Sequence, residues 1–287
     1  MHSHLRTIAE TTADTTHDTT GGAAEPGGSG ISLRGWSLNG KQGEVFADVD
    51  LDVPAGSVAI IRGAAGTGKT SLLLSLAGRM HVSAGSGSVG EYDIRKQARA
   101  VRSCVSVGHV AGLTDLEKDF TVAQHLAERL IMLQPWYKPW VSKSTLREVI
   151  GTIRDTITSA TEVIDRLPPD TFSTADAEDA DFLIDAEGAT FVSDLSELQK
   201  FLLEFSLSSL SQPPVIVLDN IDFLRERRDR ARAWAGLLIY QELRRKRDPD
   251  NPLTLIVTCE DSGDVDLVLE SLQAEIRPAS VIECELS

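Results

Sequence analysis

The hydrophobic positions of the chain follow two periods in turn, which predicts strands that alternate with helices. Alternating or short apolar segments indicate strands, because strand side chains point to opposite faces of a sheet or are buried on both. These segments are residues 31–38, 44–53, 57–62, 104–107, 215–219, 253–258 and 280–285. Helical spacing marks residues 71–78, 121–133, 144–167, 194–210, 228–247 and 265–273. The order of the two kinds of segment predicts an α/β fold with a mostly parallel sheet.

Local capping signals indicate where two of these helices begin. Thr121 is expected to cap the helix at residues 121–133, because its hydroxyl can accept a hydrogen bond from a free backbone N–H group. Asp194 and Glu197 have the spacing of a capping box, which predicts that the helix at residues 194–210 begins at residue 194. The prolines of the segment PWYKPW are expected to end the helix at residues 121–133, because proline lacks the N–H group that a helix uses.

The first thirty residues have a different composition from the rest of the chain. Residues 1–30 are rich in Thr, Gly, Ala and Asp and hold few large aliphatic side chains. Such a segment buries too little apolar surface to offset the entropy lost on ordering, so we expect a disordered N-terminal tail. Residues 31–287 are expected to form the folded domain.

The charge and composition exclude several classes of protein. The 28 Lys and Arg against 43 Asp and Glu give a net charge of −15, which argues against a nucleic-acid binder and against direct docking on anionic lipid. No apolar run approaches the roughly 18 residues that span a bilayer. The three cysteines are scattered, without the spacing of metal ligands. We therefore expect a cytoplasmic protein that does not insert into a membrane by itself.

A glycine-rich loop after the strand at residues 57–62 carries the first candidate chemistry. GAAGTGKT at residues 63–70 fits the pattern GxxxxGK[ST], with an apolar strand before it and a helix after it. In such a loop, backbone N–H groups surround a phosphate, Lys69 reaches the β- and γ-phosphates, and Thr70 holds Mg²⁺. A glycine-rich turn before a core helix is the alternative. The predicted ATP-binding residues are Gly63, Ala64, Ala65, Gly66, Thr67, Gly68, Lys69, Thr70 and Ser71.

An acidic residue at the end of another buried strand completes the expected Mg²⁺ site. Asp219 follows the apolar run PPVIVL, so its carboxylate is expected at the edge of the sheet where the phosphate loop also lies. Alone, an aspartate at the end of a strand would be a turn or capping residue. Together with the loop, it indicates a second Mg²⁺ ligand, bound directly or through water.

From residue 31 to residue 287 the sequence resembles the ATP-binding cassette (ABC) family. The resemblance is carried by GxxGxGKT in the phosphate loop, by the upstream VDLDVPAGSVAIIRG and by HVSAGSGSVGEYDI from His81. FTVAQHLAE from Phe120, LSELQ at residues 195–199 and TLIVTCED at residues 254–261 lie where the family has its helical subdomain, its LSGGQ signature and its switch region. The resemblance implies a P-loop NTPase fold with a RecA-like core, an antiparallel β-subdomain and a helical subdomain at about residues 121–190.

The sequence departs from the family pattern at the residues that hydrolyse ATP. Asn220 occupies the place of the general-base glutamate, and Cys259 that of the switch histidine. Glu197 and Leu198 replace the two signature glycines, and His109 is the nearest candidate for the Q-loop glutamine. An amide cannot accept a proton at neutral pH, and a carboxylate near the γ-phosphate repels it. We therefore expect ATP binding with weak or absent hydrolysis, and leave open whether the chain is an active ATPase.

The resemblance also implies partners. The chain would be the ATP-binding subunit of an ABC-type membrane complex, on the inner face of the cell membrane through separate transmembrane subunits, and would pair with a second cassette as a homodimer or a heterodimer. Residues 108–145 are expected to line the groove for the membrane subunits, with PWYKPW as a candidate contact. The alternative is a non-catalytic ATP-dependent sensor or scaffold. A P-loop kinase fits less well, because residues 170–190 are acidic where a kinase needs a basic lid.

Overall fold

The computed structural model describes residues 5–8, 29–41, 43–138, 140–165, 185, 187–272, 278 and 280–286. The strands are β1 (Leu5–Ile8), β2 (Ile31–Gly40), β3 (Gly43–Val53), β4 (Val58–Arg62), β5 (Ala84–Val89), β6 (Tyr92–Asp93), β7 (Val105–Val107), β8 (Val215–Leu218), β9 (Thr254–Cys259) and β10 (Val281–Glu285). The helices are α1 (Lys69–Leu76), α2 (Ala98–Cys104), α3 (Val122–Leu133), α4 (Lys143–Asp165), α5 (Glu197–Ser209), α6 (Arg227–Arg247) and α7 (Gly263–Ser271). The expected strands and helices are all present, with ends shifted by a few residues.

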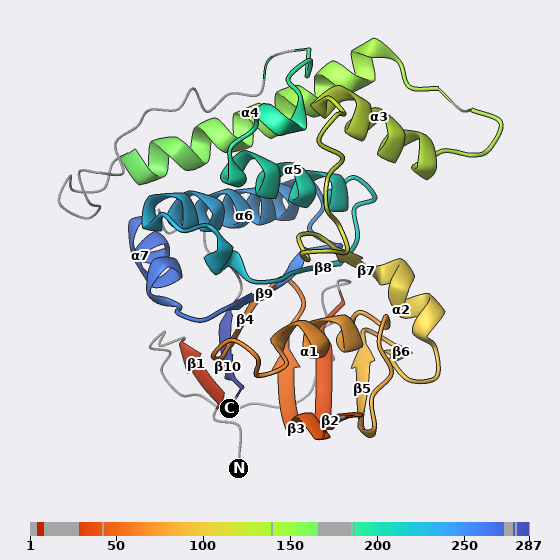
Figure 1. Cartoon of the computed structure of the whole chain (residues 1–287), viewed down its shortest axis with the longest axis vertical. Coiled ribbons are helices and arrows are strands. Elements are labelled where there is room, and N and C mark those ends of the chain that lie inside the picture. The colour runs from red at the N-terminus through yellow and green to blue at the C-terminus, as the bar shows by residue number, and fades with distance from the viewer. Residues whose placement is uncertain are drawn as a thin grey trace, which may run out of the picture.

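The strands form two sheets of different kinds. The larger sheet has six strands in the order β1-β10-β4-β9-β8-β7, and all its neighbours are parallel except β1 and β10. The smaller sheet has the order β3-β2-β5-β6 and is antiparallel. In Figure 1, α5 and α6 cover one side of the larger sheet, and α1 lies on its other side, toward the smaller sheet. The expected α/β core with an antiparallel subdomain is confirmed.

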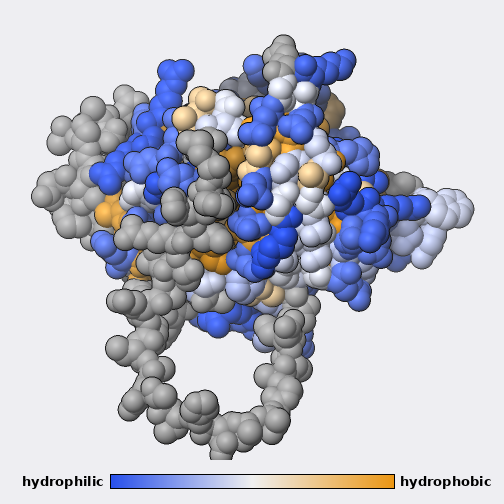
Figure 2. Space-filling view, turned by 90° about the horizontal axis from the view of Figure 1, so that it is seen from below, coloured by the Kyte–Doolittle hydropathy of each residue, from blue (hydrophilic) through white to orange (hydrophobic). Residues whose placement is uncertain are grey.

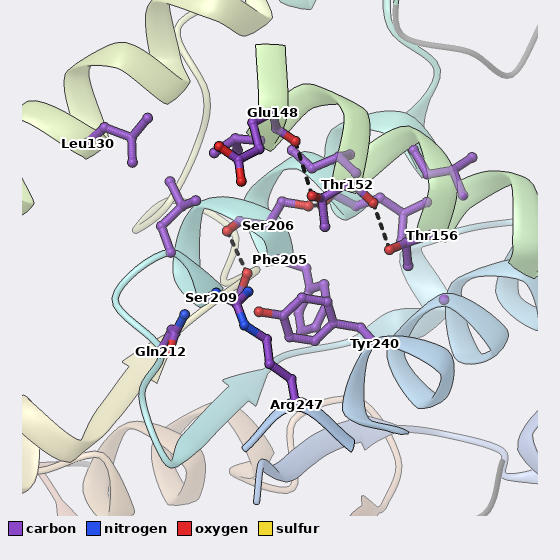
Figure 3. Close-up of a pocket in the computed structure, with 16 residues that line it drawn as sticks. Leu130, Glu148, Thr152, Thr156, Phe205, Ser206, Ser209, Gln212, Tyr240 and Arg247 are labelled. Carbon is purple, nitrogen blue, oxygen red and sulfur yellow. Dashed lines mark hydrogen bonds between the residues drawn. The ribbon is translucent and has the colours of Figure 1, made fainter. Parts of the chain in front are cut away.

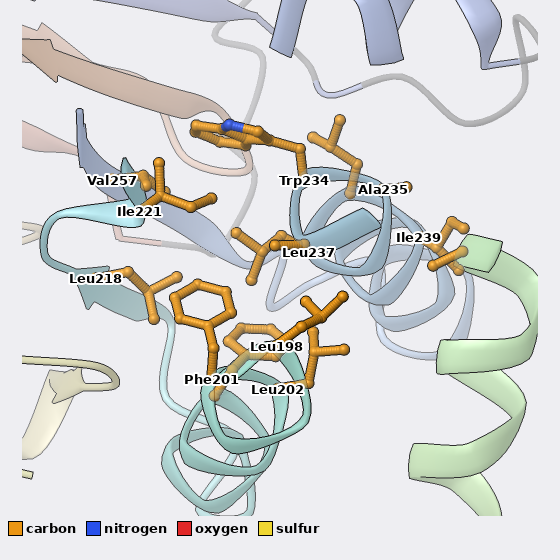
Figure 4. Packing of buried hydrophobic residues seen from close by; sticks show 14 of the residues in the cluster. Leu198, Phe201, Leu202, Leu218, Ile221, Trp234, Ala235, Leu237, Ile239 and Val257 are labelled. Atoms are coloured by element: carbon orange, nitrogen blue, oxygen red, sulfur yellow. The ribbon is translucent and has the colours of Figure 1, made fainter. Parts of the chain in front are cut away.

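Side-chain alternation in the central strands divides the interior into two hydrophobic clusters. In β4, Val58 and Ile60 belong to the cluster with α5 and α6, whereas Ala59 and Ile61 belong to the cluster with α1 and the smaller sheet. Successive strand residues point to opposite faces, so one short apolar run contributes to both. Figure 4 shows the first cluster, where Trp234 of α6 lies near Ile221 and Val257. Both faces of the sheet are therefore covered, which explains why the central strands β4, β8 and β9 consist mainly of apolar residues.

The helices α3 and α4 form an insertion whose two ends pair with each other. Thr121 and Phe191 form an isolated antiparallel bridge, and the N–H group of Val122 donates to the carbonyl of Thr190 (3.1 Å). Figure 1 shows α3 and α4 together at the edge of the molecule beyond α5. This closure is consistent with a helical subdomain at about residues 121–190, a boundary that we keep as a prediction.

One of the two expected helix starts is confirmed and the other is wrong. Thr121 caps α3 and forms a capping box with Gln124. The helix predicted from Asp194 begins instead at residue 197, with Ser196 as its cap. Val192–Asp194 forms a 3-10 turn, so the chain is already turned at Asp194 and the α-helix starts after it.

The N-terminal segment differs in one place from the expected disordered tail. Leu5–Ile8 forms β1, which pairs antiparallel with β10. Composition predicts little buried surface for this segment. Strand pairing, however, depends on backbone groups and not on side chains. Without β1, β10 would be an unpaired edge of the larger sheet. Residues 9–28, most of the acidic stretch at residues 170–190 and Pro139 of PWYKPW lie outside the described residues.

One face of the described part of the molecule is mainly hydrophilic. On the face in Figure 2, blue hydrophilic residues surround smaller orange patches. Among the described helices, none is both long enough and apolar enough to cross a membrane.

Replacing Trp234 by alanine is expected to lower the free energy of unfolding by about 3–5 kcal/mol, because it leaves a cavity where a large ring was buried. The Trp234 side chain is 0% exposed, whereas Trp136 is 91% exposed, so Trp136→Ala is the matched control and is expected to change stability by less than about 0.5 kcal/mol. Denaturant unfolding followed by circular dichroism measures both. Similar losses for the two variants would contradict the packing described here.

Candidate nucleotide-binding site

The glycine-rich loop connects the carboxyl end of β4 to the first residue of α1, and two of its glycines have no room for a side chain. Gly68 has φ of 88°, and a Cβ atom there would lie 2.7 Å from the carbonyl oxygen of Val45. A Cβ atom on Gly63 would lie 2.6 Å from Oγ1 of Thr67. Because any larger residue would displace the backbone, the loop conformation depends on these positions.

The Lys69 side chain folds back over the loop that precedes it. Its Nζ atom donates to the carbonyl oxygens of Gly63 (2.5 Å) and Ala64 (3.0 Å), and the residue is buried. The ammonium therefore lies at the N-terminus of α1, where the free N–H groups add partial positive charge. Such a combination of loop, lysine and helix start is typical of anion-binding sites.

The acidic residue predicted from the end of β8 lies directly beside this helix start. Asp219 is buried, and its Oδ2 atom accepts a hydrogen bond from Oγ1 of Thr70 (2.6 Å). Its Oδ1 atom accepts from Oγ1 of Thr258 in β9 (2.6 Å). The structure thus brings together two residues that are 149 positions apart in sequence.

Thr258 is a site residue that the sequence analysis missed. Besides donating to Asp219, its hydroxyl oxygen accepts a hydrogen bond from the backbone N–H of Asn220 (2.6 Å). It therefore fixes both the carboxylate and the following residue, which has the left-handed φ of 53°. A polar residue near the end of the apolar strand β9 was the available signal, but its significance depends on β8 and β9 being neighbours.

Asn220 and Cys259 both lie at the carboxyl edge of the parallel sheet. Asn220 follows β8 and is exposed, whereas Cys259 ends β9 and is paired in register with Arg62. The Cys259 side chain belongs to the hydrophobic cluster beneath α6 and is 0% exposed. Burial raises the pKa of its thiol to about 12, so the thiol is protonated and neutral near pH 7.

A second carboxylate, which the sequence analysis did not single out, lies at the same edge. Asp222 accepts a hydrogen bond from the backbone N–H of Glu260 through Oδ2 (2.6 Å). Burial raises the pKa of the Asp222 carboxyl. Asp222 therefore joins the turn after β8 to the turn after β9, next to the bonds made by Thr258.

His109 connects the site to α5 rather than offering a free side chain. Its carbonyl oxygen accepts from the N–H of Asp219 (2.8 Å), and its Nδ1 atom lies 2.5 Å from Oε2 of Glu204. Its ring stacks on Phe223 at 4.3 Å between centroids and meets Phe201 edge-on. The residue expected as a substitute for the Q-loop glutamine is thus held in place by aromatic packing.

The segment LSELQ begins α5 and is used for capping and packing. Oγ of Ser196 accepts from the N–H of Gln199, and Oε1 of Gln199 accepts from the N–H of Ser196. Leu198 is fully buried, whereas the Glu197 side chain is exposed and pairs with Lys200 at 2.8 Å. The negative charge of Glu197 is therefore partly compensated within its own helix.

Two hollows beside α5 lie away from the phosphate loop. One, of about 300 Å³, is lined by residues that include Gly108, Leu113, Thr114 and Arg129 from the expected groove segment, together with Glu204 and Leu207 of α5. Trp136, Tyr137 and Trp140 do not line this hollow and are exposed. The other, of about 290 Å³, lies between α4, α5 and α6, where Tyr240 packs edge-on against Phe205 and the Arg247 side chain extends toward Ser209 (Figure 3). Nothing in the sequence analysis indicated this hollow.

The fold and the loop define a P-loop nucleotide-binding protein with an antiparallel subdomain. The family model described as ABC transporter matches residues 46–221, and the chain belongs to this family.

Comparison with known proteins gives relatives of the same kind. The chain is 35% identical to the cytochrome c biogenesis ATP-binding export protein CcmA of Pseudomonas putida, over 36% of this chain and 45% of CcmA. It is 30% identical to the nucleoside import ATP-binding protein NupA of Lactococcus lactis subsp. cremoris, over 42% of this chain and 24% of NupA. The chain therefore matches less than half the length of these relatives.

Solved structures share the fold at low sequence identity. The chain is similar to cbiO1 of Clostridium perfringens, part of the ABC transporter complex cbiONQ, with a TM-score of 0.60 and 15% identity over 83% of this chain and 81% of cbiO1. It is also similar to a nucleotide-free ATP-binding cassette from an ABC transporter, with a TM-score of 0.58 and 15% identity over 85% of each chain. The ABC-type fold expected from the sequence is confirmed.

The buried thiols of Cys259 and Cys284 are expected to resist iodoacetamide at pH 8 in the folded protein. Burial raises their pKa values to about 12 and about 11, so very little reactive thiolate is present and access is blocked. Mass spectrometry of the alkylated protein measures this. In guanidinium chloride all three cysteines should be labelled, which is the control. Rapid labelling of Cys259 in the folded protein would contradict its burial.

Proposed function

We propose that the chain binds ATP with Mg²⁺ at residues 63–71 and Asp219, and acts as the ATP-binding subunit of an ABC-type membrane complex. The observation that carries the proposal is the 2.6 Å hydrogen bond between Oγ1 of Thr70 and Oδ2 of Asp219. This bond places the end of the phosphate loop beside the end of β8. The chain also belongs to the ABC transporter family.

The residues at this point fit a magnesium ion. Mg²⁺ prefers oxygen ligands and is held in NTP sites by one or two protein groups together with phosphate oxygens. The hydroxyl of Thr70 and the carboxylate of Asp219 are such groups, and Thr258 keeps the carboxylate oriented through Oδ1 (2.6 Å). When bound, the ion would neutralise phosphate charge. Lys69 and the first N–H groups of α1 would hold the phosphates themselves.

Asn220 and Cys259, at the carboxyl edge of the larger sheet, favour weak or absent hydrolysis of ATP. Asn220 carries an amide, which cannot accept a proton from water at neutral pH. Cys259 is buried in the hydrophobic cluster, so its thiol cannot replace a histidine that contacts phosphate. Loss of a general base commonly costs about 10²–10⁴ in rate. In a paired cassette, Glu197 would add a carboxylate where the signature normally offers backbone N–H groups.

The hollow of about 300 Å³, which lies beside the end of β7, supports the proposal that separate membrane subunits are the partners of this chain. It contains Gly108, Thr114 and Arg129 from the expected groove, and its wall includes Glu204, which pairs with His109. The relatives named as export and import ATP-binding proteins and the cbiONQ subunit fit a subunit of such a complex. Trp136, Tyr137 and Trp140 are 91%, 60% and 64% exposed and form a further candidate contact.

A non-catalytic ATP-dependent sensor or scaffold is the second candidate. Asn220 and the buried Cys259 favour it, because ATP that is bound and not consumed can stabilise one conformation. Lys69, Thr70 and Asp219 fit both functions. The two candidates differ in whether bound ATP is hydrolysed once the membrane partners are present.

Paired measurements of ATP affinity and steady-state hydrolysis test the proposal, with Lys69→Ala beside the native chain. We expect the native chain to bind ATP, and Lys69→Ala to bind it about 10–100-fold more weakly, because charged hydrogen bonds contribute about 1.5–3 kcal/mol. Phosphate release should remain near the background. Native-like affinity in Lys69→Ala would refute the ATP site, whereas Lys69-dependent turnover would refute the weak-hydrolysis part alone.

Restoring the general base alone is expected to leave hydrolysis well below that of an intact cassette. In Asn220→Glu, Cys259 and Glu197 still differ from the family pattern, so at most a modest gain in phosphate release is expected. Asn220→Gln is the control, since it adds the same length without a base. Full family-like turnover in Asn220→Glu would show that Cys259 and Glu197 do not limit the reaction.

A further inference from the structure

A pocket lined by cationic side chains lies beyond the C-terminal end of α1. It has a volume of about 270 Å³, and its basic lining residues are Arg79, His81, Arg95 and Arg102. Among the described residues, none of those that line it is acidic. In a chain with a net charge of −15, such a group of like charges is unusual.

The guanidinium groups of this pocket have no carboxylate partner among the described residues. Arg95 donates through Nη1 to the carbonyl oxygen of Gly85 (2.9 Å), and Arg102 donates through Nη1 to that of Gly78 (2.8 Å). The guanidinium of Arg79 makes no hydrogen bond or ion pair with any described residue. Carbonyl bonds fix the positions of Arg95 and Arg102 but leave their positive charges in place.

The surroundings of Arg79 also carry positive charge. Partial burial lowers the pKa of the Arg79 guanidinium, and so do the nearby charges of Arg102 and Arg129. Arg79 also lines the neighbouring hollow that contains Arg129. Bringing several like charges together costs free energy, and a bound anion would reduce that cost.

We propose that this pocket binds a phosphate group. A phosphate presents several acceptor oxygens and up to two negative charges, and the planar fork of each arginine matches two such oxygens. A single carboxylate offers only one charge to three arginines. The phosphate could belong to a soluble molecule or to a lipid headgroup, since both offer the same chemistry to the pocket.

The pocket is separate from the proposed ATP site. The loop leads into the N-terminus of α1 at Lys69, whereas Gly78 and Arg79 follow its other end, and the helix of eight residues is about 12 Å long. The two sites share no residue. The phosphate pocket therefore does not depend on ATP binding, and either can fail in experiment while the other stands.

Titration of the full chain with pyrophosphate by calorimetry tests the proposal, in a Lys69→Ala background that weakens phosphate binding at the loop. We expect saturable binding that Arg79→Gln weakens at least about tenfold, since one charged contact is lost. Arg79 is chosen because its guanidinium makes no hydrogen bond or ion pair with the described residues. Arg99→Gln is the matched control: it removes the same charge from the exposed surface of α2, outside the pocket, and should change the affinity less than twofold.

A second arm distinguishes the source of the phosphate. Vesicles of phosphatidylcholine with phosphatidic acid are sedimented with the same variants, against phosphatidylcholine alone. Arg79-dependent binding of pyrophosphate without vesicle binding would assign a soluble ligand, and Arg79-dependent vesicle binding would assign a headgroup. Binding of neither probe, or equal binding by Arg79→Gln and Arg99→Gln, would overturn the proposal.

Discussion

The carboxylate of Asp219 accepts hydrogen bonds from two threonine hydroxyls that belong to different elements of the fold. Thr70 reaches it from the start of α1 and Thr258 from the end of β9, each at 2.6 Å. A buried carboxylate is costly unless its oxygens are hydrogen-bonded, so these bonds make its position tolerable. They also fix the phosphate loop, the turn after β8 and the end of β9 relative to one another. The geometry of the proposed ATP site depends on this contact.

The two hydrophobic clusters hold the partners of that contact in place. The cluster with α5 and α6 positions the strands from one side, and α1 with the smaller sheet positions them from the other. Leu72, Leu73 and Leu76 of α1 are completely buried, so the helix cannot shift without opening the core. Because His109 is held by Phe201, Phe223 and Glu204, the α5 side of the fold is also linked to Asp219 through a backbone hydrogen bond. A shift of α5 would therefore be transmitted through His109 to Asp219 and the proposed ATP site.

Most of the fold could be predicted from the sequence because its signals are local. The apolar runs of β4, β8 and β9 predict strands, and the glycine-rich loop predicts a phosphate site, each from a few neighbouring residues. The roles of Thr258 and Glu204 could not be predicted, since they depend on which strands and helices become neighbours. Asp194 and Ser196 both begin a capping-box pattern, and only the 3-10 turn at Val192–Asp194 decides between them. The pairing of β1 likewise depends on the open edge of β10 rather than on its own composition.

The most direct test of the Asp219 contact is the Mg²⁺ dependence of ATP affinity in the native chain and in Asp219→Asn. Equilibrium binding of a fluorescent ATP analogue would be measured with excess Mg²⁺ and with a chelator. The native chain should bind more tightly with Mg²⁺, and Asp219→Asn should lose about tenfold or more of that gain, because an amide is a weaker ligand than a carboxylate. Affinity without metal should change little. If Asp219→Asn kept the full gain from Mg²⁺, Asp219 would not hold the ion, and the site described here would be wrong.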